Sequence, residues 1–333
     1  MRALLSERPG GPETLVLRDI ADPVPGPGEV VVDVRACGAN FPDVLIIQDK
    51  YQFRPPRPFA PGAEIAGTVA AVGPGVDRLA IGDRVIGSIL SGGMAEKAIV
   101  AADRCLSMPD AMPFDEAAAF ILTYGTSYHA LKQRASLRPG ETLLVLGAAG
   151  GVGIAACELG RAMGARVVAA VSSEEKLALA RKHGAESGLV YGVGPLTRDD
   201  SKALADAFKR ACGQNGADVI YDPVGGDYAE PALRAVAWEG RYLVVGFPAG
   251  IPKIPLNLAL LKSCQIVGVF WGGFAARDQE ANARNNRELL DLYAAGKIRP
   301  FVSERMPLER GGEAIMKLAA RQATGKIVVT MGG

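Results

Sequence analysis

The 333-residue sequence contains few of the residues that bind metals or form disulfide bonds. It has two histidines, His129 and His183, and no Cys-x-x-Cys pair. Zinc ribbons and redox dithiols need closely spaced thiols or imidazoles, so neither is expected. The five cysteines are scattered singly, and we expect them to be reduced and mostly buried: Cys37, Cys105, Cys157, Cys212 and Cys264.

Strong charge and long apolar runs are also missing. The chain has 37 Lys and Arg against 36 Asp and Glu, and its net charge of +1 offers no field that would attract nucleic acid or an anionic membrane. No run approaches the ~18 uninterrupted apolar residues of a membrane span, and the N-terminus lacks the apolar segment of a signal peptide. We therefore expect a cytoplasmic protein whose partner is a small molecule, with no nucleic acid and no membrane involved.

The length of the chain and the changing rhythm of the sequence predict two domains. Up to about residue 120, short β-rich runs lie between glycines and prolines at residues 29–36, 65–72, 84–89 and 95–100. They predict an antiparallel, barrel-like domain. From residue 142 to about 246, apolar strands alternate with amphipathic helices, which predicts an α/β domain with a doubly wound parallel sheet.

The C-terminal part is expected to fold back onto the first domain. Residues 265–270 and 326–330 have the pattern of strands, and residues 279–295 and 309–320 that of amphipathic helices. The predicted boundaries are a first domain at residues 1–122, a nucleotide-binding domain at 123–264 and a return to the first domain at 265–333.

A glycine-rich turn, residues 147–153, joins the first strand of the alternating region to its helix. In the G-x-G-x-x-G frame, Ala148 takes the first glycine position, Gly150 the second and Gly153 the third. A small second residue lets backbone N–H groups approach a pyrophosphate at the helix N-terminus, and the third glycine lets helix and strand pack closely. The predicted cofactor contacts in the turn are Ala149, Gly150, Gly151, Val152 and Gly153.

The end of the second strand bears on the choice of cofactor. An NAD site is expected to place Asp or Glu there to hold the ribose hydroxyls. This strand instead ends in Ser172 and Ser173, with Lys176 shortly after, and hydroxyls with an ammonium suit the 2′-phosphate of NADPH. Alternatively, one serine merely caps the next helix and Lys176 is solvated. Glu174 or Glu175 folding back onto the ribose would reverse the preference.

Several further motifs resemble those of the medium-chain dehydrogenase/reductase superfamily, and they follow one another along the chain in the superfamily's order. The resemblance spans the whole chain and implies a Rossmann doubly wound sheet plus a discontinuous GroES-like β-barrel catalytic domain. The motifs are residues 37–43 (Cys-Gly-Ala-Asn-Phe-Pro-Asp), Tyr51, residues 58–67, 72–76, 82–85 and 122–128, the glycine-rich turn, and residues 325–328.

The ligands of the superfamily's zinc-dependent branch are missing. That branch is known for a catalytic zinc held by Cys, by the His of a Gly-His-Glu segment and by a second Cys. Here Asn40 and Ala63 stand where the first Cys and the His are expected, and residues 120–123 supply no thiol. The chain therefore resembles the zinc-independent quinone oxidoreductase branch, which is zeta-crystallin-like. This resemblance implies NADPH, no metal, hydride transfer to quinones or α,β-unsaturated carbonyls, and a homodimer.

The resemblance also implies site residues. Asn40, Asp43, Tyr51 and Thr126 match residues near the nicotinamide and are expected to serve catalysis. Tyr51 would position the acceptor and donate a hydrogen bond to its oxygen, and Asn40 would offer its amide; Asp43 has an equal alternative role in fixing its loop. Further cofactor contacts are expected at Ser172, Lys176, Tyr191, Gly246, Phe247, Phe270 and Lys326, with Trp271 and Arg321 matching nearby positions. Packing is the alternative for these aromatic residues, and solvation is the alternative for Arg321 and Lys326.

Two other functions stay open. Arg54 and Arg57 flank the expected substrate mouth and would suit the phosphates of an acyl-CoA, so a 2-enoyl thioester reductase is the alternative within the same class. They are otherwise an ordinary exposed loop. A non-catalytic NADPH- or RNA-binding protein is the alternative from another class, although the balanced charge gives no support for nucleic acid. His129 is expected to be structural.

Overall fold

The structure is a computed structural model that describes residues 1–332. The chain divides into two compact units, each described here by itself. The first comprises Met1–Leu122 and the residues from Pro300 onward, and the second comprises Thr123–Arg299. The return to the first unit therefore begins at Pro300, and the expected return at residue 265 is wrong. The reason is that the strand starting at Gln265 pairs with the parallel sheet of the second unit.

The second unit is built on a six-stranded sheet in which every pairing is parallel. Its strand order, β10-β9-β8-β11-β12-β13, is that of a doubly wound dinucleotide-binding sheet. Every residue of β8 is buried, as expected for a central strand covered on both faces. The strands are β8 (Thr142–Leu146), β9 (Arg166–Val171), β10 (Ser187–Val190), β11 (Ala217–Asp222), β12 (Val236–Val244) and β13 (Gln265–Gly268).

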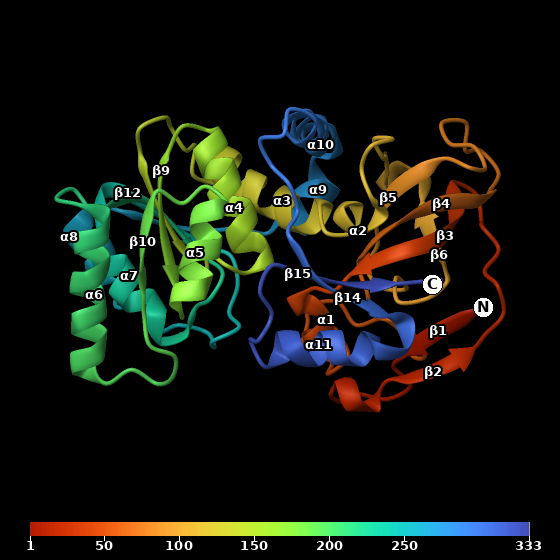
Figure 1. The fold of residues 1–333 in the computed structure, drawn as a ribbon, viewed down its shortest axis with the longest axis horizontal. Coiled ribbons are helices and arrows are strands. Elements are labelled where there is room, and N and C mark those ends of the chain that lie inside the picture. The colour runs from red at the N-terminus through yellow and green to blue at the C-terminus, as the bar shows by residue number, and fades with distance from the viewer. Residues whose placement is uncertain (333) are drawn as a thin grey trace. The chain divides into compact units, whose positions relative to one another are not determined.

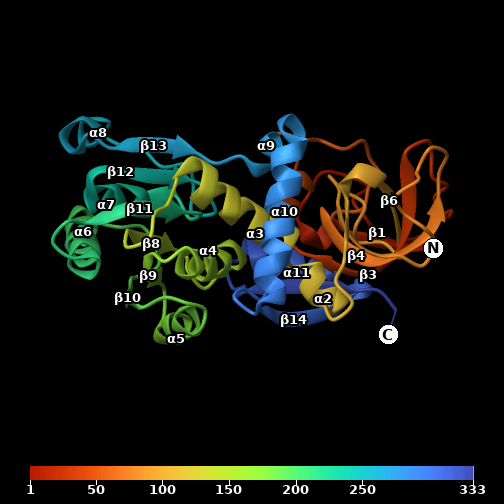
Figure 2. The same ribbon diagram turned by 90° about the horizontal axis from the view of Figure 1, so that it is seen from above.

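Helices cover both faces of this sheet. Figure 2 shows α4 and α5 on one face and α6 and α7 on the other. The face under α6 and α7 forms one apolar core that joins Leu144 and Val168 of the strands to Phe208 and Leu233 of the helices. The helices are α3 (Ile121–Tyr128), α4 (Gly151–Ala162), α5 (Glu174–Lys182), α6 (Arg198–Cys212), α7 (Ala229–Arg234), α8 (Asn257–Lys262), α9 (Trp271–Arg277) and α10 (Gln279–Ala294).

The first unit contains a largely antiparallel sheet in the order β14-β15-β3-β4-β5-β7, with β6 paired to β3. A separate two-stranded sheet joins β1 and β2. The strands are β1 (Arg2–Leu5), β2 (Val16–Asp19), β3 (Glu29–Gly38), β4 (Glu64–Val72), β5 (Arg84–Ser88), β6 (Lys97–Ala101), β7 (Cys105–Ser107), β14 (Val302–Pro307) and β15 (Lys326–Thr330). The helices are α1 (Phe41–Ile46), α2 (Phe114–Ala117) and α11 (Gly311–Ala319).

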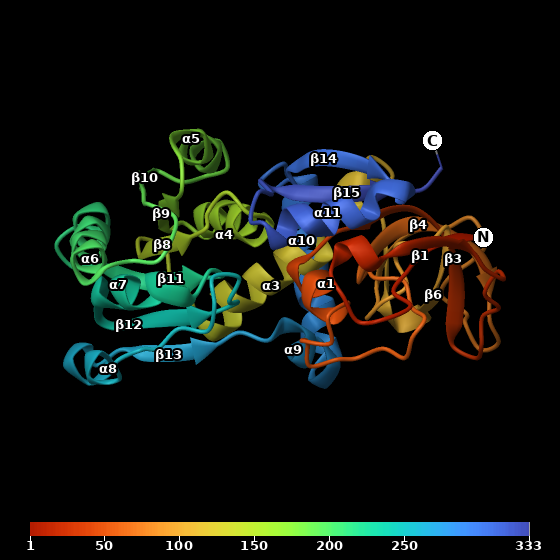
Figure 3. The same cartoon turned by 90° about the horizontal axis from the view of Figure 1, so that it is seen from below.

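The two ends of the chain share the core of the first unit. The C-terminal strand β15, blue in Figure 1, lies antiparallel to β3 with Val329 opposite Cys37. Helix α11 packs against α1 and β15, as Figure 3 shows. Ile315 and Val329 are buried in the same cluster as Val32 and Ile65. This pairing brings Lys326, the first residue of β15, beside the end of β3.

Three details of the fold differ from the sequence prediction. The pairing of β14 with β15 is parallel, whereas the first domain was expected to be antiparallel. Strand β12 begins at Val236, although the apolar run typical of a buried strand starts only after Arg241, because Ala217 of β11 already pairs with Val236. Helix α1 has no predicted counterpart, since six residues are too few for a helical period to show. Among residues 1–332, no helix has both the length and the apolar composition needed to cross a bilayer.

Candidate functional site

The glycine-rich turn lies between β8 and α4, at the carboxyl end of the parallel sheet. Gly147 has φ = +58°, a left-handed backbone that favours glycine. A Cβ atom at Gly153 would lie 2.2 Å from the carbonyl oxygen of Gly147, so α4 can approach the turn only if residue 153 is glycine. Gly147, rather than Ala148, therefore makes the tight turn, and Gly153 has the packing role that the sequence predicts.

The start of α4 has the properties of an anion site. The first N–H groups of any helix lack acceptors within the helix, and its N-terminus carries partial positive charge. In α4 these groups belong to Gly151, Val152 and Gly153. A Cβ atom at Gly150 would make only one ordinary contact, at 3.4 Å from the Gly147 carbonyl oxygen. The space above Gly150 is therefore open to a ligand. The turn thus fits the pyrophosphate of a dinucleotide.

Helix α3 is fastened to this turn. The hydroxyl of Ser127 donates a hydrogen bond to the Val152 carbonyl oxygen at 3.0 Å and lies 2.9 Å from the hydroxyl of Tyr221 in β11. Thr126, the preceding residue, is half-buried on the same helix. The predicted site residue Thr126 and the glycine-rich turn therefore belong to one connected part of the second unit.

Ser172 and Lys176 meet at the end of β9. The Lys176 ammonium donates to the Ser172 hydroxyl at 3.0 Å, and the Ser173 hydroxyl caps α5 by accepting from the Lys176 N–H at 3.3 Å. The two serines therefore have different roles: Ser173 caps the helix, and Ser172 binds the ammonium of Lys176. Tyr191 directly follows β10, and its N–H donates to the Val171 carbonyl at 2.9 Å. Since β9 and β10 are neighbours, Tyr191 follows the strand end next to that of Ser172. Its ring packs on the apolar core, with its centroid 5.0 Å from that of Tyr228, as the packing alternative expects.

The loops after β11 and β12 form the next part of the same edge. The buried carboxylate of Asp222 accepts from the N–H groups of Val224 and Gly225 at 2.8 and 2.9 Å and from the Tyr242 hydroxyl. Burial raises the pKa of Asp222. The Gly246 N–H donates to the Asp222 carbonyl oxygen at 3.4 Å, which ties the two loops together.

The aromatic residues beyond these strands have different environments. Phe247 is 41% exposed and Phe270 is 60% exposed, so both offer ring surface to a ligand. Trp271 instead packs: its ring lies 2.9 Å from the position that a Cβ of Gly125 would occupy, and its N–H donates to Asn282 at 3.1 Å. The packing alternative therefore describes Trp271, and Gly125 is small because the indole lies against it.

A second group of predicted residues surrounds Asn40 in the first unit. An ammonium only donates hydrogen bonds, so the side-chain oxygen of Asn40 faces Lys326, which donates to it at 2.6 Å. The amide nitrogen of Asn40 donates to the Gly38 carbonyl at 3.0 Å and to the Glu64 carboxylate at 3.2 Å. Both amide protons are thus bound inside the protein, which leaves none for the donor role expected of Asn40.

Lys326 and Glu64 form a buried ion pair beside Asn40. The Lys326 ammonium lies 3.3 Å from Glu64 Oε2 and also donates to the Ala39 carbonyl at 3.1 Å. With the bond to Asn40, its three N–H groups meet three acceptors, so none is left to reach a cofactor. Lys326 is 5% exposed and is not solvated.

Asp43 fixes the start of α1. Its carboxylate accepts from the Asn40 N–H at 2.8 Å and from the Gly62 N–H at 3.0 Å, which supports the loop-fixing alternative. Burial raises the pKa of Asp43 to about 6, although these two bonds and Lys326 oppose the shift. Tyr51 lies partly exposed against the core, and burial together with the negative charge of Asp43 raises the pKa of its hydroxyl.

Arg57 and His129 have structural partners. Arg57 donates to Asp49 at 2.7 Å and to the Ile47 carbonyl at 3.0 Å, so it braces its own loop, whereas Arg54 is exposed. His129 is buried, stacks on Phe274 at 4.1 Å between ring centroids, and lies 3.3 Å from Gln133 Oε1. Burial lowers the pKa of His129.

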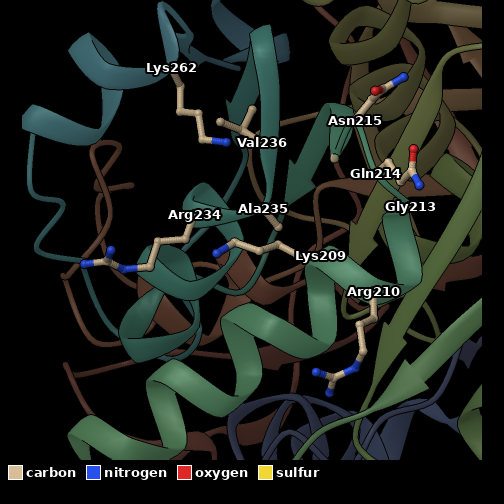
Figure 4. Close-up of a pocket in the computed structure, with 10 residues that line it drawn as sticks. Lys209, Arg210, Gly213, Gln214, Asn215, Arg234, Ala235, Val236 and Lys262 are labelled. Carbon is tan, nitrogen blue, oxygen red and sulfur yellow. The ribbon is translucent and has the colours of Figure 1, made fainter.

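A pocket of about 420 Å³ lies at the opposite, amino end of the parallel sheet, where β11 and β12 begin (Figure 4). Lys209 and Lys262 line it, together with Arg210 and Arg234. These cations belong to the last turns of α6, α7 and α8, where basic residues offset the negative ends of helix dipoles. Arg234 also pairs with Glu230 at 2.6 Å. The pocket is therefore separate from the predicted cofactor residues, which lie at the carboxyl end.

Sequence reasoning missed three residues that organise these sites: Glu64, Ser127 and Asp222. A charged residue at the start of an otherwise uncharged strand is a signal for Glu64. A carboxylate at a strand end, with Pro223 and two glycines within four residues after it, is a signal for Asp222. Nothing in the sequence distinguishes Ser127. Among residues 1–332, no three His, Cys, Asp or Glu side chains gather where they could hold a metal ion.

Comparison with known proteins identifies both units. Residues 26–110 match the family described as alcohol dehydrogenase GroES-like domain, and residues 151–287 match the family described as zinc-binding dehydrogenase. The Rossmann-type sheet and the GroES-like domain implied by the resemblance are thus confirmed. Together with the glycine-rich turn, they define an oxidoreductase of the medium-chain class.

Relatives narrow this class. The chain is 38% identical over 308 residues to a quinone oxidoreductase-like protein 2 homolog of Nematostella vectensis, covering 91% of this chain and 82% of that protein. It is 36% identical to the quinone oxidoreductase of Pseudomonas aeruginosa, covering 96% of each. The crystal structure of Escherichia coli quinone oxidoreductase complexed with NADPH matches with a TM-score of 0.90 at 29% identity, covering 99% of this chain and all of that one. The chain belongs to the quinone oxidoreductase branch of the medium-chain dehydrogenase/reductase superfamily.

Proposed function

We propose that the protein is a zinc-independent, NADPH-dependent reductase of quinones or α,β-unsaturated carbonyls. The observation that carries the proposal is the end of β9, where the Lys176 ammonium and the Ser172 hydroxyl stand in place of the acidic residue of an NAD site. The NADPH complex of the Escherichia coli quinone oxidoreductase, which shares the fold, supports the same cofactor.

The second unit binds the cofactor. Lys176 and Ser172 would hold the 2′-phosphate, with Tyr191 at the neighbouring strand end, and the first N–H groups of α4 would hold the pyrophosphate. Exposed rings at Phe247 and Phe270 and the small Gly246 border the remaining edge. NADPH supplies the hydride. These residues orient it and add no covalent step.

The first unit handles the acceptor. Tyr51 is partly exposed, and its hydroxyl donates a hydrogen bond to the acceptor oxygen on which negative charge develops. The direction of its pKa shift, upward, favours the protonated form that can donate. Asn40 and Asp43 hold α1, the helix that precedes Tyr51, in place through their internal hydrogen bonds. Thr126 of the second unit borders the cofactor.

The reaction needs no zinc. The metal named in the description of the second family does not fit these residues, because Asn40 and Ala63 offer neither thiolate nor imidazole. Without a Lewis acid, simple alcohols are poor substrates, since their alkoxide lacks stabilisation. A quinone or enone delocalises the incoming charge onto its own oxygen, where hydrogen-bond donors suffice.

Stopped-flow loss of NADPH absorbance with a small quinone or enone tests the proposal. We expect turnover that a chelator leaves unchanged, with NADH as the weaker donor. Tight NADPH binding without turnover on any quinone or enone would instead favour a non-catalytic NADPH-binding protein. Free CoA that competes with the acceptor would favour the 2-enoyl thioester reductase, for which Arg54 is the exposed cation.

We further propose that the protein is a homodimer that pairs through β13. This strand is an edge of the parallel sheet, and an exposed edge pairs readily with another copy. Exposed large apolar side chains concentrate around it, a pattern that marks interaction surfaces. Apart from the two rings assigned to the cofactor edge, they are Ile251, Leu256, Leu260, Leu261 and Ile266. A cytoplasmic location also remains a proposal, which the five free thiols support because the cytoplasm is reducing.

A further inference from the structure

The ion pair between Glu64 and Lys326 joins distant parts of the first unit. Glu64 lies in β4 and is fully buried, whereas Lys326 begins β15 at the other end of the chain. Besides its bonds to Lys326 and Asn40, the Glu64 carboxylate accepts from the Leu122 N–H at 2.9 Å. The pair therefore connects β4 and β15 with Leu122, the last residue of the unit's N-terminal segment.

Fold stability alone does not account for such a pair. Removing two charges from water is costly, and well-packed apolar residues of similar volume often stabilise a core equally or better. The pair instead fixes the orientation of the Asn40 side chain. The ammonium determines which way the Asn40 carboxamide points, and the carboxylate receives one of the two amide protons.

The fixed carboxamide belongs to a chain of contacts that ends at the acceptor site. Asn40 directly precedes α1, and its N–H donates to Asp43 in the first turn of that helix. Asp43 in turn accepts from Gly62, on the loop just before Glu64. Tyr51 lies five residues beyond the end of α1, with its ring against the same core.

We propose that Glu64 and Lys326 are positioning residues for the acceptor: their ion pair orients Asn40, thereby holds α1, and through α1 sets the place of Tyr51. This inference rests on the proposed function, since it assigns a role at the same acceptor site. Lys326 and Glu64 touch neither acceptor nor cofactor in this role. The C-terminal strand therefore completes a site built mainly from residues 38–64.

The test replaces both charges together, so that neither is left buried without its partner. Glu64→Gln with Lys326→Met keeps the approximate volumes, and the carboxamide oxygen introduced at position 64 can still accept from the Leu122 N–H. We expect kcat/KM for a small quinone to fall at least tenfold and NADPH Kd to stay within twofold. Amide hydrogen exchange in residues 41–51 should become at least tenfold faster.

A matched control neutralises a partly buried ion pair in the second unit. Arg241 and Glu141 lie 2.7 Å apart with side chains 14% and 18% exposed. Glu141→Gln with Arg241→Met should leave exchange in residues 41–51 and quinone kcat/KM at wild-type values, even if the melting temperature falls. A loss of stability alone would thus be separated from a loss of positioning.

Unchanged kcat/KM and unchanged exchange in the Glu64/Lys326 double variant would overturn the inference. If that variant does not fold, Glu64→Asp tests the inference instead. It keeps the charge but moves the carboxylate away from Lys326 and Asn40 by the length of one methylene. A partial fall in quinone kcat/KM with faster exchange supports the inference, and wild-type values overturn it. Should the wild type reduce no quinone or enone, the proposed function fails, while the exchange measurement still tests the positioning of α1.

Discussion

Lys176 is the residue that bears most directly on the choice between NADPH and NADH. Its ammonium lies 3.0 Å from the Ser172 hydroxyl, beside the end of β9 where an NAD site would carry an acidic side chain. Hydrogen bonds to charged groups are worth about 1.5–3 kcal/mol, which is roughly 10- to 100-fold in affinity.

Lys176→Ala should therefore weaken NADPH binding by about 10- to 100-fold and leave NADH binding nearly unchanged. Fluorescence titration with each cofactor measures the two Kd values. Glu175→Ala, at the exposed position next to Lys176, is the control and should change neither. Equal weakening of both cofactors would remove the assignment of the phosphate site.

Tyr51 should matter for turnover and not for the cofactor. Tyr51→Phe removes one hydrogen-bond donor to the acceptor oxygen while keeping the ring that packs on the core. We expect kcat/KM for a quinone to fall by about tenfold, and NADPH Kd to stay constant. Wild-type kinetics in this variant would leave Tyr51 with a packing role only.

Asp43 should make stability depend on pH in the direction opposite to most carboxylates. Its pKa rises from 3.8 to about 6 on folding, so between these values the native state binds more protons than the unfolded state. Its contribution to stability is complete below pH 3.8 and is lost as pH rises through 6, a change of about 3 kcal/mol.

Thermal melts at several pH values compare the wild type with Asp43→Asn, which cannot titrate. Asn is expected to cost stability at every pH, because its NH₂ group would face one of the two N–H donors, from Asn40 and Gly62. The difference in melting temperature between the two proteins should shrink as pH rises from about 4 to about 7. A difference that stays constant or grows would contradict the raised pKa.

At the scale of the element, the turn between β8 and α4 separates two roles of glycine. Alanine usually stabilises a helix by about 1 kcal/mol relative to glycine. At Gly153 this preference is overridden, since the new methyl would lie 2.2 Å from the Gly147 carbonyl oxygen. At Gly150 only an ordinary contact is met, but the methyl would occupy the space expected for the pyrophosphate.

Gly153→Ala should thus lower both the melting temperature and NADPH affinity, whereas Gly150→Ala should lower NADPH affinity alone. Differential scanning calorimetry and cofactor titration on the same samples separate the two outcomes. If Gly153→Ala proved more stable than the wild type, the close approach of α4 to the turn would be refuted.

The elements themselves could largely be predicted from the sequence. The expected strand at residues 326–330 coincides with β15, and the region expected to alternate from residue 142 begins with β8. Continuous apolar runs bounded by glycine mark such buried strands clearly. Helix α1 and the early start of β12 could not be predicted. A six-residue helix shows no period, and the first residues of β12 are recruited by pairing with β11.

At the scale of the whole molecule, the exposed apolar surface around β13 bears on assembly. Leu260 and Leu261 are 78% and 63% exposed on α8, next to an edge strand that pairs only with β12 within residues 1–332. Exposed leucines at an unpaired edge strand promote aggregation of a monomer, whereas a two-fold interface would bury them.

Replacing both leucines by glutamate should convert a dimer to a monomer without unfolding it, because neither side chain lies in a core. Light scattering coupled to size-exclusion chromatography gives the mass directly. Val24→Glu, 82% exposed in the first unit, is the control and should leave the mass unchanged. A wild-type protein that is monomeric at micromolar concentration would exclude the proposed dimer.

The sequence by itself determined the class of fold, the position of the dinucleotide turn and the absence of zinc ligands at Asn40 and Ala63, since each depends on residues near one another in the chain. Only the tertiary structure decided what Asn40, Glu64 and Lys326 do. Their roles depend on contacts across 24 and 262 positions of sequence, at 3.2 and 3.3 Å, and no local pattern encodes which buried donors and acceptors a fold will bring together. The same holds for the boundary at Pro300, because the strand pairing of β13, rather than its composition, assigns residues 265–299 to the second unit.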